Sequence, residues 1–469
     1  MVFSSITFLF FFLPAFLILY YLVPGRAKNV VLLVFSLIFY AWGEPKYIFL
    51  MMFSSMVDYL DGLALNALHA HPKMRKLPLA AALIINLGLL AYFKYADFAV
   101  GIWNSLTPWD RELPGVALPI GISFYTFQTV SYSIDVYKER IKPEKNYFDY
   151  LTYVCMFPQL IAGPIVRFST VQQELKDRKV CESGFVKGFR RFLTGLFRKV
   201  LIADQCGALW EGIRTAGNIS AVTAWLGILA FTLQLYFDFS AYSDMAIGLG
   251  EMLGFHFPEN FLYPLSATSI TDFWRKWHIS LSSWFRDYVY IPLGGNRAGT
   301  LKHLRNMFAV WFLTGLWHGA SWNFVLWGLY HGVLLTLEKY VWGKGLKKLP
   351  KLLQHLYAIV IVVVGFGIFT FDDLGELALY FPKLICAAGN PFLGPELIWH
   401  AGNYLPFLLA AFILSFPVYP AFKEKLGKAD VHRRNLAEIL GVLATVALFV
   451  LALSSMVRDS YSPFLYFRF

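Results

Sequence analysis

The chain has 469 residues, of which 57% are hydrophobic, 18% aromatic and only 15% charged, and its formal net charge is +11. A mean hydropathy of +0.53 and a charged share well below the roughly 25% of an average soluble domain exclude an ordinary soluble protein. The basic clusters flank hydrophobic stretches and no separate recognition module follows them, which argues against nucleic-acid binding. We expect one integral membrane domain over residues 1–469, with membrane lipid around it and no nucleic-acid partner.

Long apolar stretches recur along the chain, each long enough to cross a hydrocarbon layer about 30 Å thick as a helix. They predict about ten to twelve crossings and an all-α polytopic fold. The first stretch lacks the basic start and cleavage site of a secretory signal, so we expect it to be retained. The predicted spans are 3–23, 29–60 (broken at 43–45), 77–103, 118–137, 148–166, 186–215, 222–254, 303–320, 322–342, 354–371, 403–420 and 435–457.

Two of these stretches contain helix-breaking residues. Residues 118–125 open with Pro119 and Gly121, and residues 156–164 are interrupted by Pro158 and by Gly163-Pro164. Broken backbone at membrane depth is tolerated where it lines a protein cavity or water. We expect re-entrant or cavity-lining segments here, and a proline-kinked ordinary helix fits the sequence equally well.

A first cluster of polar residues lies within the apolar run 234–248. Asp238, Tyr242 and Asp244 are spaced so that they could face one cavity on a helix. Ionisable groups at such depth are costly and commonly functional. The structural alternative, in which these carboxylates pair with buried arginines to hold helices together, is the one we favour for this cluster taken alone.

A second cluster covers residues 271–288 and continues to the Gly294-Gly295 pair. Its Trp and Tyr residues alternate with Arg, Lys and Asp, a composition typical of an amphipathic segment at a membrane face. We therefore expect it to lie in the interface rather than to span the membrane. His278 is the side chain in this cluster best suited to catalysis, although a lone histidine among aromatics is more often packed and hydrogen-bonded.

The third cluster surrounds His318 within residues 312–328. Gly315 and Gly319 stand one helical turn apart, and such small residues let another backbone or a ligand approach closely. A neutral buried imidazole can take a proton from an attacking hydroxyl near neutral pH. We take His318 as the central catalytic candidate, within a segment 232–342 that carries the chemistry, and interpret His331 as structural.

Several motifs are missing from the sequence. It contains no Walker A loop, no GxGxxG, no nucleophile elbow and no HExxH. The four cysteines show neither CxxC nor metal-ligand spacing, so we expect no metal site, no disulfide and no bound cofactor. ATP-driven transport and zinc proteolysis lose support accordingly.

Several long motifs resemble the membrane-bound O-acyltransferase (MBOAT) family, in its AlgI-like polysaccharide O-acetyltransferase branch. They are the opening MVFSS, LPIGISFYTFQTVSY, IAGPIVRF, the run 234–248, FWRKWHISLSSWFRDYVYIPLGG and GLWHGASWNFVLWG. They occur in the family's order and cover essentially the whole chain.

The resemblance implies a central funnel and a tunnel joining the two membrane faces. It implies His318 as the essential family histidine and His278 as the second family position, which is histidine or asparagine in different branches. The donor would be cytoplasmic acetyl-CoA and the acceptor an extracytoplasmic polysaccharide, through an SGNH-type partner similar to AlgX or AlgJ at the bacterial inner membrane. Residues expected to line the tunnel or bind substrate are Asp238, Tyr242, Trp274, Arg286, Asp287, Trp317 and Asn323.

These expectations combine into a mechanism in which His318 deprotonates the acceptor hydroxyl. His278, or a nearby Trp, Asn or backbone donor, would stabilise the oxyanion. The aromatic tail 458–469 resembles the C-terminal motif of a small protein that works with the D-alanyl-transferring relatives, so Tyr466 becomes a candidate acyl acceptor. An interfacial aromatic anchor is the structural alternative for this tail.

Two other functions remain open. A D-alanyl transferase of the teichoic-acid type would use the same fold with another donor. A non-catalytic transporter of glycan or acyl groups would need neither histidine.

Overall fold

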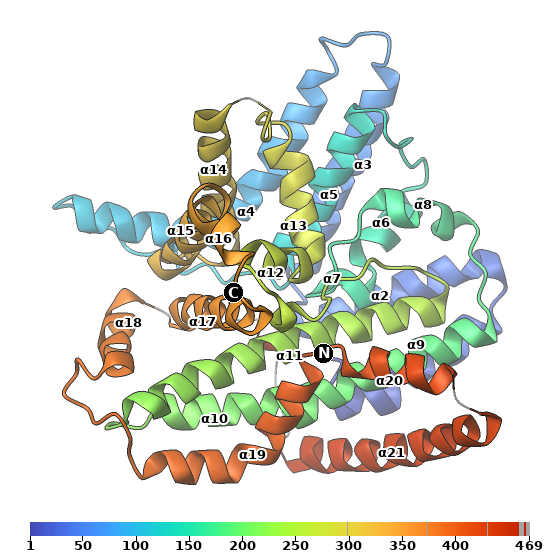
Figure 1. Cartoon of the computed structure of the whole chain (residues 1–469). Helices are drawn as coiled ribbons and strands as arrows, with labels where there is room; N and C mark the ends of the chain where they lie inside the picture. Colours follow the sequence, from blue (N-terminus) through green and yellow to red (C-terminus); the bar gives the residue numbers. More distant parts are fainter. Residues whose placement is uncertain (298, 372, 429, 459–463, 466–469) are drawn as a thin grey trace. The chain divides into compact units, whose positions relative to one another are not determined.

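The computed structural model describes residues 1–297, 299–371, 373–428, 430–458 and 464–465, and every regular element in these residues is helical. Figure 1 traces the helices in chain order. They fall into two compact units, and the boundary between the units lies within α9, α11 and α13. Unit 1 contains Met1–Phe192, Ser243–Glu259 and Ser283–Pro292, and unit 2 contains Leu193–Tyr242, Asn260–Ser282 and Leu293–Phe469.

Unit 1 is built around three long helices that pack against one another, α3, α4 and α5. Its elements are η1 (Phe8–Phe12), α1 (Leu13–Leu22), η2 (Gly25–Ala27), α2 (Lys28–Gly43), α3 (Ile48–Ala67), α4 (Lys76–Leu106), α5 (Ile122–Tyr137), α6 (Tyr147–Cys155), α7 (Phe157–Leu160), α8 (Phe168–Lys176), most of α9 (Glu182–Phe197), the end of α11 (Ala221–Leu253), the end of α13 (Ile279–Phe285) and η5 (Arg286–Tyr290).

Unit 2 contains the rest of α11, in which most residues are buried, and the hairpin formed by α14 and α15. Its further elements are η3 (Arg198–Ala203), α10 (Asp204–Arg214), η4 (Pro264–Ser266), α12 (Ile270–Lys276), α14 (Thr300–His318), α15 (Trp322–Leu337), η6 (Glu338–Trp342), α16 (Gly343–Leu346), α17 (Lys351–Phe369), α18 (Leu374–Tyr380), η7 (Phe381–Ile385), α19 (Glu396–Leu414), α20 (Val418–Gly427) and α21 (Val431–Arg458).

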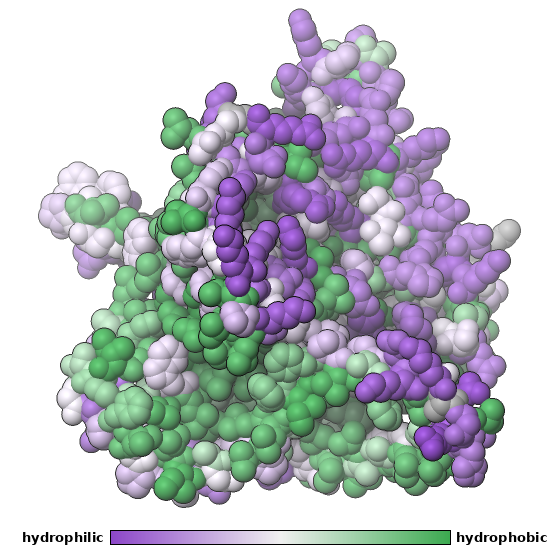
Figure 2. All heavy atoms as spheres, viewed as in Figure 1, coloured by the Kyte–Doolittle hydropathy of each residue, from purple (hydrophilic) through white to green (hydrophobic). Residues whose placement is uncertain are grey.

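Six helices in the described residues are long and apolar enough to cross a membrane, namely α3, α4, α11, α17, α19 and α21. Two shorter apolar helical stretches, Phe8–Leu22 and Lys28–Gly43, add to them. In the view of Figure 2, apolar side chains gather over α19 and α21, and the long α21 helix exposes many of its Leu, Ile and Val side chains. The chain is therefore a multi-pass membrane protein, as composition predicts.

Most predicted spans correspond to observed helices, with local corrections. The break at residues 43–45 is confirmed, since α2 ends at Gly43 and α3 begins at Ile48. The predicted span 403–420 is wrong in its boundaries, because α19 begins earlier and ends at Leu414. Pro417, which stands before α20, cannot continue a helix with a backbone N–H.

The two broken segments of the sequence meet in the structure. Gly121, at φ +78°, begins α5, and a Cβ placed on it would stand 2.9 Å from the carbonyl oxygen of Leu160. Residues 156–166 are buried, and after the single turn α7 they run on without helix as far as Arg167. This segment is therefore a buried irregular connection and not a proline-kinked helix.

Glycines also set the packing of the α14–α15 hairpin. A Cβ on Gly315 would collide with the carbonyl oxygen of Phe324, and a Cβ on Gly328 with that of Trp311. The predicted close approach at Gly315 and Gly319 is confirmed, with α15 as the partner. This approach fixes the end of α14, where His318 stands.

Gly121 allows a direct test of this packing. We expect Gly121→Ala to lower the free energy of unfolding by about 1–3 kcal/mol, because the new Cβ meets a carbonyl oxygen at a positive φ. The control is Gly88→Ala in α4, where a Cβ would meet nothing within 4 Å. Thermal denaturation of the two detergent-solubilised variants gives the comparison, and equal stability of both would contradict the proposed packing.

Candidate functional site

His318 is the last residue of α14 and is buried, with 6% of its surface exposed. Its ring lies edge-on to three aromatic rings, Trp317 and Trp327 at 5.0 Å and Phe369 at 5.3 Å between centroids. The C-terminal end of a helix carries partial negative charge, which stabilises a positive charge placed there. This position therefore suits an imidazole that takes up a proton during a reaction.

His278 and His318 contact the same indole. The ring of Trp317 lies 5.0 Å from that of His318 and 6.0 Å from that of His278. The two histidines are 40 residues apart in the sequence, and His278 comes from the junction of α12 and α13. Unit 2 thus brings together the two residues that the sequence selected independently.

The backbone of His278 adopts an unusual conformation. Its φ is +43°, in the left-handed region that few residues other than glycine adopt. Asn and His are among the more tolerant residues there. The side chain is almost fully buried, against the rings of Phe239 at 4.7 Å and Phe261 at 6.3 Å. Burial lowers the pKa of His278 to about 3, so this imidazole is neutral near pH 7.

Asn260 holds the segment around His278 in place. Its side-chain oxygen accepts the backbone N–H of Ser280 at 3.2 Å and the Ser280 hydroxyl at 2.9 Å, and lies 3.2 Å from Nδ1 of His278. The Asn260 backbone oxygen accepts the N–H of Ile279 at 3.0 Å. No sequence rule selected Asn260, which lies 18 residues before its partner His278 in the sequence.

These bonds determine the tautomer of His278. A backbone N–H can only donate, so the atom of Asn260 that faces Ser280 is its oxygen. Nδ1 of His278 must then carry the proton and donate it to that same oxygen. Nε2 keeps its lone pair, is buried, and has no hydrogen-bond partner among the described residues. A neutral His278 is thus an acceptor at Nε2, which favours the alternative in which another donor, such as a nearby Trp, stabilises the oxyanion.

The segment that carries His278 buries several aromatic residues inside the protein, while Arg275 and Arg286 are exposed. Phe273, Trp277, Leu281 and Trp284 are all buried. The backbone N–H groups that open α12 are paired inside the protein, since Ile270 and Thr271 donate to the carboxylate of Glu338 at 2.8 and 3.0 Å. Phe273 and Trp277 also pack on one another, with 5.5 Å between their ring centroids. The interfacial position of this segment stays a prediction.

Trp274 belongs to a second aromatic group, around His331. Its indole N–H donates to Nδ1 of His331 at 3.4 Å, and its ring lies 4.7 Å from that of Trp311. Trp327 contacts both His331 at 5.1 Å and His318 at 5.0 Å. Because an indole only donates, the neutral His331 carries its proton on Nε2, opposite to His278. Its contacts agree with the structural interpretation of this residue.

The polar residues of α11 have separate partners. Asp238, in unit 2, is buried and pairs with Lys199 at 2.7 Å. Asp244, in unit 1, pairs with Arg191 at 2.9 Å. The ring of Tyr242 packs edge-on against Phe464 at 4.8 Å. Both carboxylates are therefore paired with cations: Asp238 with the buried Lys199 rather than with an arginine, and Asp244 with the partly exposed Arg191.

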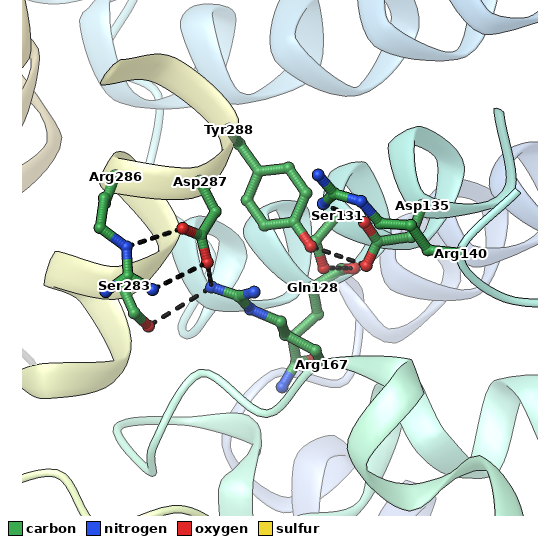
Figure 3. A network of polar contacts seen from close by, with 9 residues as sticks. All are labelled: Gln128, Ser131, Asp135, Arg140, Arg167, Ser283, Arg286, Asp287 and Tyr288. Atoms are coloured by element: carbon green, nitrogen blue, oxygen red, sulfur yellow. Dashed lines mark hydrogen bonds and ion pairs between the residues drawn. The ribbon is translucent and has the colours of Figure 1, made fainter. Parts of the chain in front are cut away.

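Arg286 and Asp287 belong to unit 1, in the network of Figure 3. Asp287 accepts from Arg286 at 2.7 Å and from Arg167 at 2.8 Å. Partial burial opposes its ionisation, but these hydrogen bonds and charges outweigh it and hold the pKa of Asp287 below its usual value. In the same network Tyr288 donates to Asp135 at 2.7 Å. Asp287 is thus ion-paired within unit 1, whereas 62% of the Arg286 side chain is exposed.

The other two predicted site residues differ in how far the structure describes them. Asn323 is fully buried at the start of α15, where its amide donates to the carbonyl oxygen of Phe371 and its oxygen accepts from Ser321. Asn323 therefore connects α15 to the end of α17. Tyr466 lies outside the described residues. Within those residues, no group of three or more His, Cys, Asp or Glu side chains is arranged to hold a metal ion.

The sequence is similar to a known protein family and to several of its members. The model of the MBOAT, membrane-bound O-acyltransferase family matches residues 73–371. The chain is 39% identical to a probable alginate O-acetylase AlgI of Pseudomonas putida over the full length of both proteins. It is 35% identical to a peptidoglycan O-acetyltransferase of Helicobacter pylori, over 80% of this chain and 78% of that protein. A teichoic acid D-alanyltransferase of Bacillus subtilis is 29% identical over 54% of this chain and 68% of its own length.

The contact between Asn260 and His278 predicts how stability depends on pH. In the unfolded wild type His278 binds a proton below about pH 6.5, whereas in the folded state it stays neutral down to about pH 3. The free energy of unfolding therefore decreases as the pH is lowered from about 6.5 to about 3. Asn260→Asp keeps the acceptor and adds a negative charge, which raises the folded-state pKa of His278. We expect the stability difference between wild type and variant to narrow from about pH 7.5 to about pH 5.

The control repeats Asn260→Asp in a His278→Asn background. Asparagine tolerates the left-handed backbone at position 278, and its side chain does not take up a proton in this pH range. Chemical denaturation at the two pH values measures all four proteins. Equal narrowing in both backgrounds would mean that the introduced carboxylate itself titrates, and would refute the coupling.

Proposed function

Because the chain belongs to the membrane-bound O-acyltransferase family, we propose that it transfers an acetyl group across the membrane for O-acetylation of an extracytoplasmic polysaccharide. The observation that carries this proposal is the pair of buried histidines, His278 and His318, packed on one indole in unit 2. One is a neutral acceptor and the other stands at a helix C-terminus, which suits activation of a hydroxyl.

Acetyl is the group that the relatives support best. Two of them are named for O-acetylation, one for alginate and the other for peptidoglycan, and both match most or all of this chain. The relative named for D-alanyl transfer is less similar and covers about half of it. An acetyltransferase for an alginate-like exopolysaccharide or a cell-wall glycan is therefore favoured over a D-alanyl transferase. A transporter would leave the two placed imidazoles without a task.

The route of the acetyl group follows from the membrane setting. We place the protein in the bacterial inner membrane, with acetyl-CoA as donor on the cytoplasmic side. The acceptor polysaccharide lies on the other side, where an SGNH-type partner similar to AlgX or AlgJ would complete the transfer. The sugar itself then never has to cross the hydrocarbon layer. Coenzyme A and the acetyl group act as substrates, and no resident cofactor is required.

His318 performs the proton transfer in this mechanism. Its imidazole takes the proton of the acceptor hydroxyl while the hydroxyl oxygen bonds to the carbonyl carbon of the acetyl thioester. The carbon–sulfur bond then breaks, and the thiolate of coenzyme A leaves and receives the proton. General-base help of this kind contributes roughly 10²- to 10⁴-fold, and the end of α14 stabilises the imidazolium that forms in between.

Trp317 and His278 have complementary tasks. An indole N–H only donates, so Trp317, which contacts both imidazoles, is the donor we assign to the oxyanion. The single proton of the attacking hydroxyl goes to His318, so we assign His278, which contacts the same indole, the task of positioning Trp317. Asn260 acts through His278 as a positioning residue.

Tyr466 is the candidate for the first acetyl acceptor. Its phenol would attack the thioester, hold the acetyl group as an aryl ester, and release it to the partner protein. An aryl ester is a more reactive donor than the sugar ester that finally forms, so the second transfer runs downhill. The polysaccharide is then the last acceptor in a sequence of two transfers.

We expect His318→Ala and His318→Gln to remain inserted and folded while losing at least about 10²-fold in acetyl transfer, because the general base is absent. The control is His331→Gln, a buried histidine on the neighbouring helix that lies outside the mechanism, and it should cost stability more than activity. The measurement is polysaccharide acetyl content together with acetyl-CoA consumption in membranes. Near-normal acetylation by His318→Ala would rule out the assignment.

Tyr466→Phe should abolish polysaccharide acetylation while the protein level is unchanged, because the ring stays and the phenol is lost. Mass spectrometry of the peptide containing Tyr466 should show a mass increase of one acetyl group in the wild type supplied with acetyl-CoA. Full acetylation of the polysaccharide by Tyr466→Phe would show that the transfer bypasses this residue.

A further inference from the structure

Two residues that follow α21, Phe464 and Leu465, are bound inside unit 2. Phe464 is 1% exposed, and the backbone N–H of Leu465 donates to Oδ2 of Asp238 at 2.7 Å. We propose that Lys199, Asp238 and Tyr242 form a docking site for this segment, and that the docked segment is a working part of the catalytic unit.

The first element of the docking site is a buried ion pair in which Lys199 contacts only one of the two carboxylate oxygens of Asp238. Lys199 and Asp238 are each 2% exposed, and the ammonium of Lys199 lies 2.7 Å from Oδ1 of Asp238 and 2.7 Å from Oδ1 of Asp204. The other oxygen of Asp238 is the one that accepts from Leu465. A buried carboxylate needs hydrogen bonds on both oxygens as well as its counter-ion. The docked segment thus completes the pairing of Asp238.

The second element of the docking site recognises an aromatic ring. The ammonium of Lys199 stands 4.9 Å from the centre of the Phe464 ring, and Tyr242 meets the same ring edge-on at 4.8 Å. A desolvated cation over an aromatic face and an edge-to-face aromatic pair are both favourable. The chemistry that fits is an aromatic residue followed by a residue with a free main-chain N–H. An aliphatic residue in place of Phe464 would lose both ring contacts.

The docking site adjoins the candidate catalytic site on α11. Phe239 and Tyr242 are three residues apart on this helix, where side chains are neighbours. Phe239 contacts His278 and Tyr242 contacts Phe464. Phe464 therefore contacts α11 about one helical turn from Phe239, the residue of α11 that contacts His278. The part of the docked segment in transfer rests on the proposed function, whereas the docking itself does not.

Photo-crosslinking in native membranes tests the docking. The full chain carries benzoylphenylalanine in place of Phe464, which keeps an aromatic ring, and the crosslinked peptides are identified by mass spectrometry. We expect crosslinks to peptides that contain Lys199 or residues 238–242. The same amino acid at Phe412, which is 61% exposed on α19, is the control and should not label them. Failure of the Phe464 position to label those peptides would overturn the proposal.

Activity then tests the part that docking plays. We expect Phe464→Ala to lower acetyl transfer by about tenfold or more, equivalent to about 1.4 kcal/mol, and Phe464→Tyr to restore it to within about twofold because the ring returns. Thermal denaturation checks that both variants are folded. Transfer by a folded Phe464→Ala protein within about twofold of the wild type would refute a working role.

One comparison separates this proposal from the function on which it rests. Crosslinking is repeated in the His318→Ala and Tyr466→Phe backgrounds, where the docking residues are intact and we expect the same crosslinked peptides. If these remain while neither background affects acetylation, the docking stands and the proposed mechanism fails. If they disappear in both, the docking proposal fails.

Discussion

In an apolar environment a polar group has to find its partner inside the protein, because no water is present to replace one. The carboxylate of Glu338 accepts the first backbone N–H groups of α12, and Asn260 accepts from the segment that follows α12. Asp238 is paired on one oxygen by Lys199 and on the other by the backbone of Leu465. Each of these contacts joins two segments that are separate in the sequence. The hydrogen bonds and the ion pair that these buried polar groups need therefore also hold the segments of unit 2 together.

This constraint makes the two candidate histidines chemically different. His278 is buried, neutral and committed at Nδ1, so its other nitrogen is available only as an acceptor. His318 stands at the end of a helix, where a positive charge is stabilised. The shared indole of Trp317 keeps both in one aromatic environment. In the mechanism that we propose, these side chains supply a base, a positioning residue and a donor.

The residues of the proposed mechanism that the structure describes all belong to unit 2. The ion-paired network around Asp287 belongs to unit 1 and stabilises that unit internally (Figure 3). Relatives named for alginate and for peptidoglycan share the family with this chain. A common acetyl-transferring core with different final acceptors agrees with both observations, since the core must handle a thioester and a hydroxyl and need not bind a long polymer.

The sequence alone predicted the membrane class, most of the helices and the two histidines, because length, hydropathy and local spacing are properties of neighbouring residues. It also predicted the close approach at Gly315, since a missing Cβ has one main structural use between helices. It placed residues 271–288 at a membrane face because aromatic and charged residues alternate there, and the structure adds that several of these aromatic rings pack on one another.

Only the tertiary structure could decide what depends on contacts between distant segments. The choice of Lys199 rather than an arginine as the partner of Asp238, the tautomer of His278 and the part of Asn260 in setting it all depend on which groups share a buried volume. The residues next to a group in the sequence do not show which distant groups share its buried volume. His318 could be selected from its surroundings in the sequence, but the acceptor nitrogen of His278 became known only when Ser280 and His278 were seen to share one side-chain oxygen of Asn260.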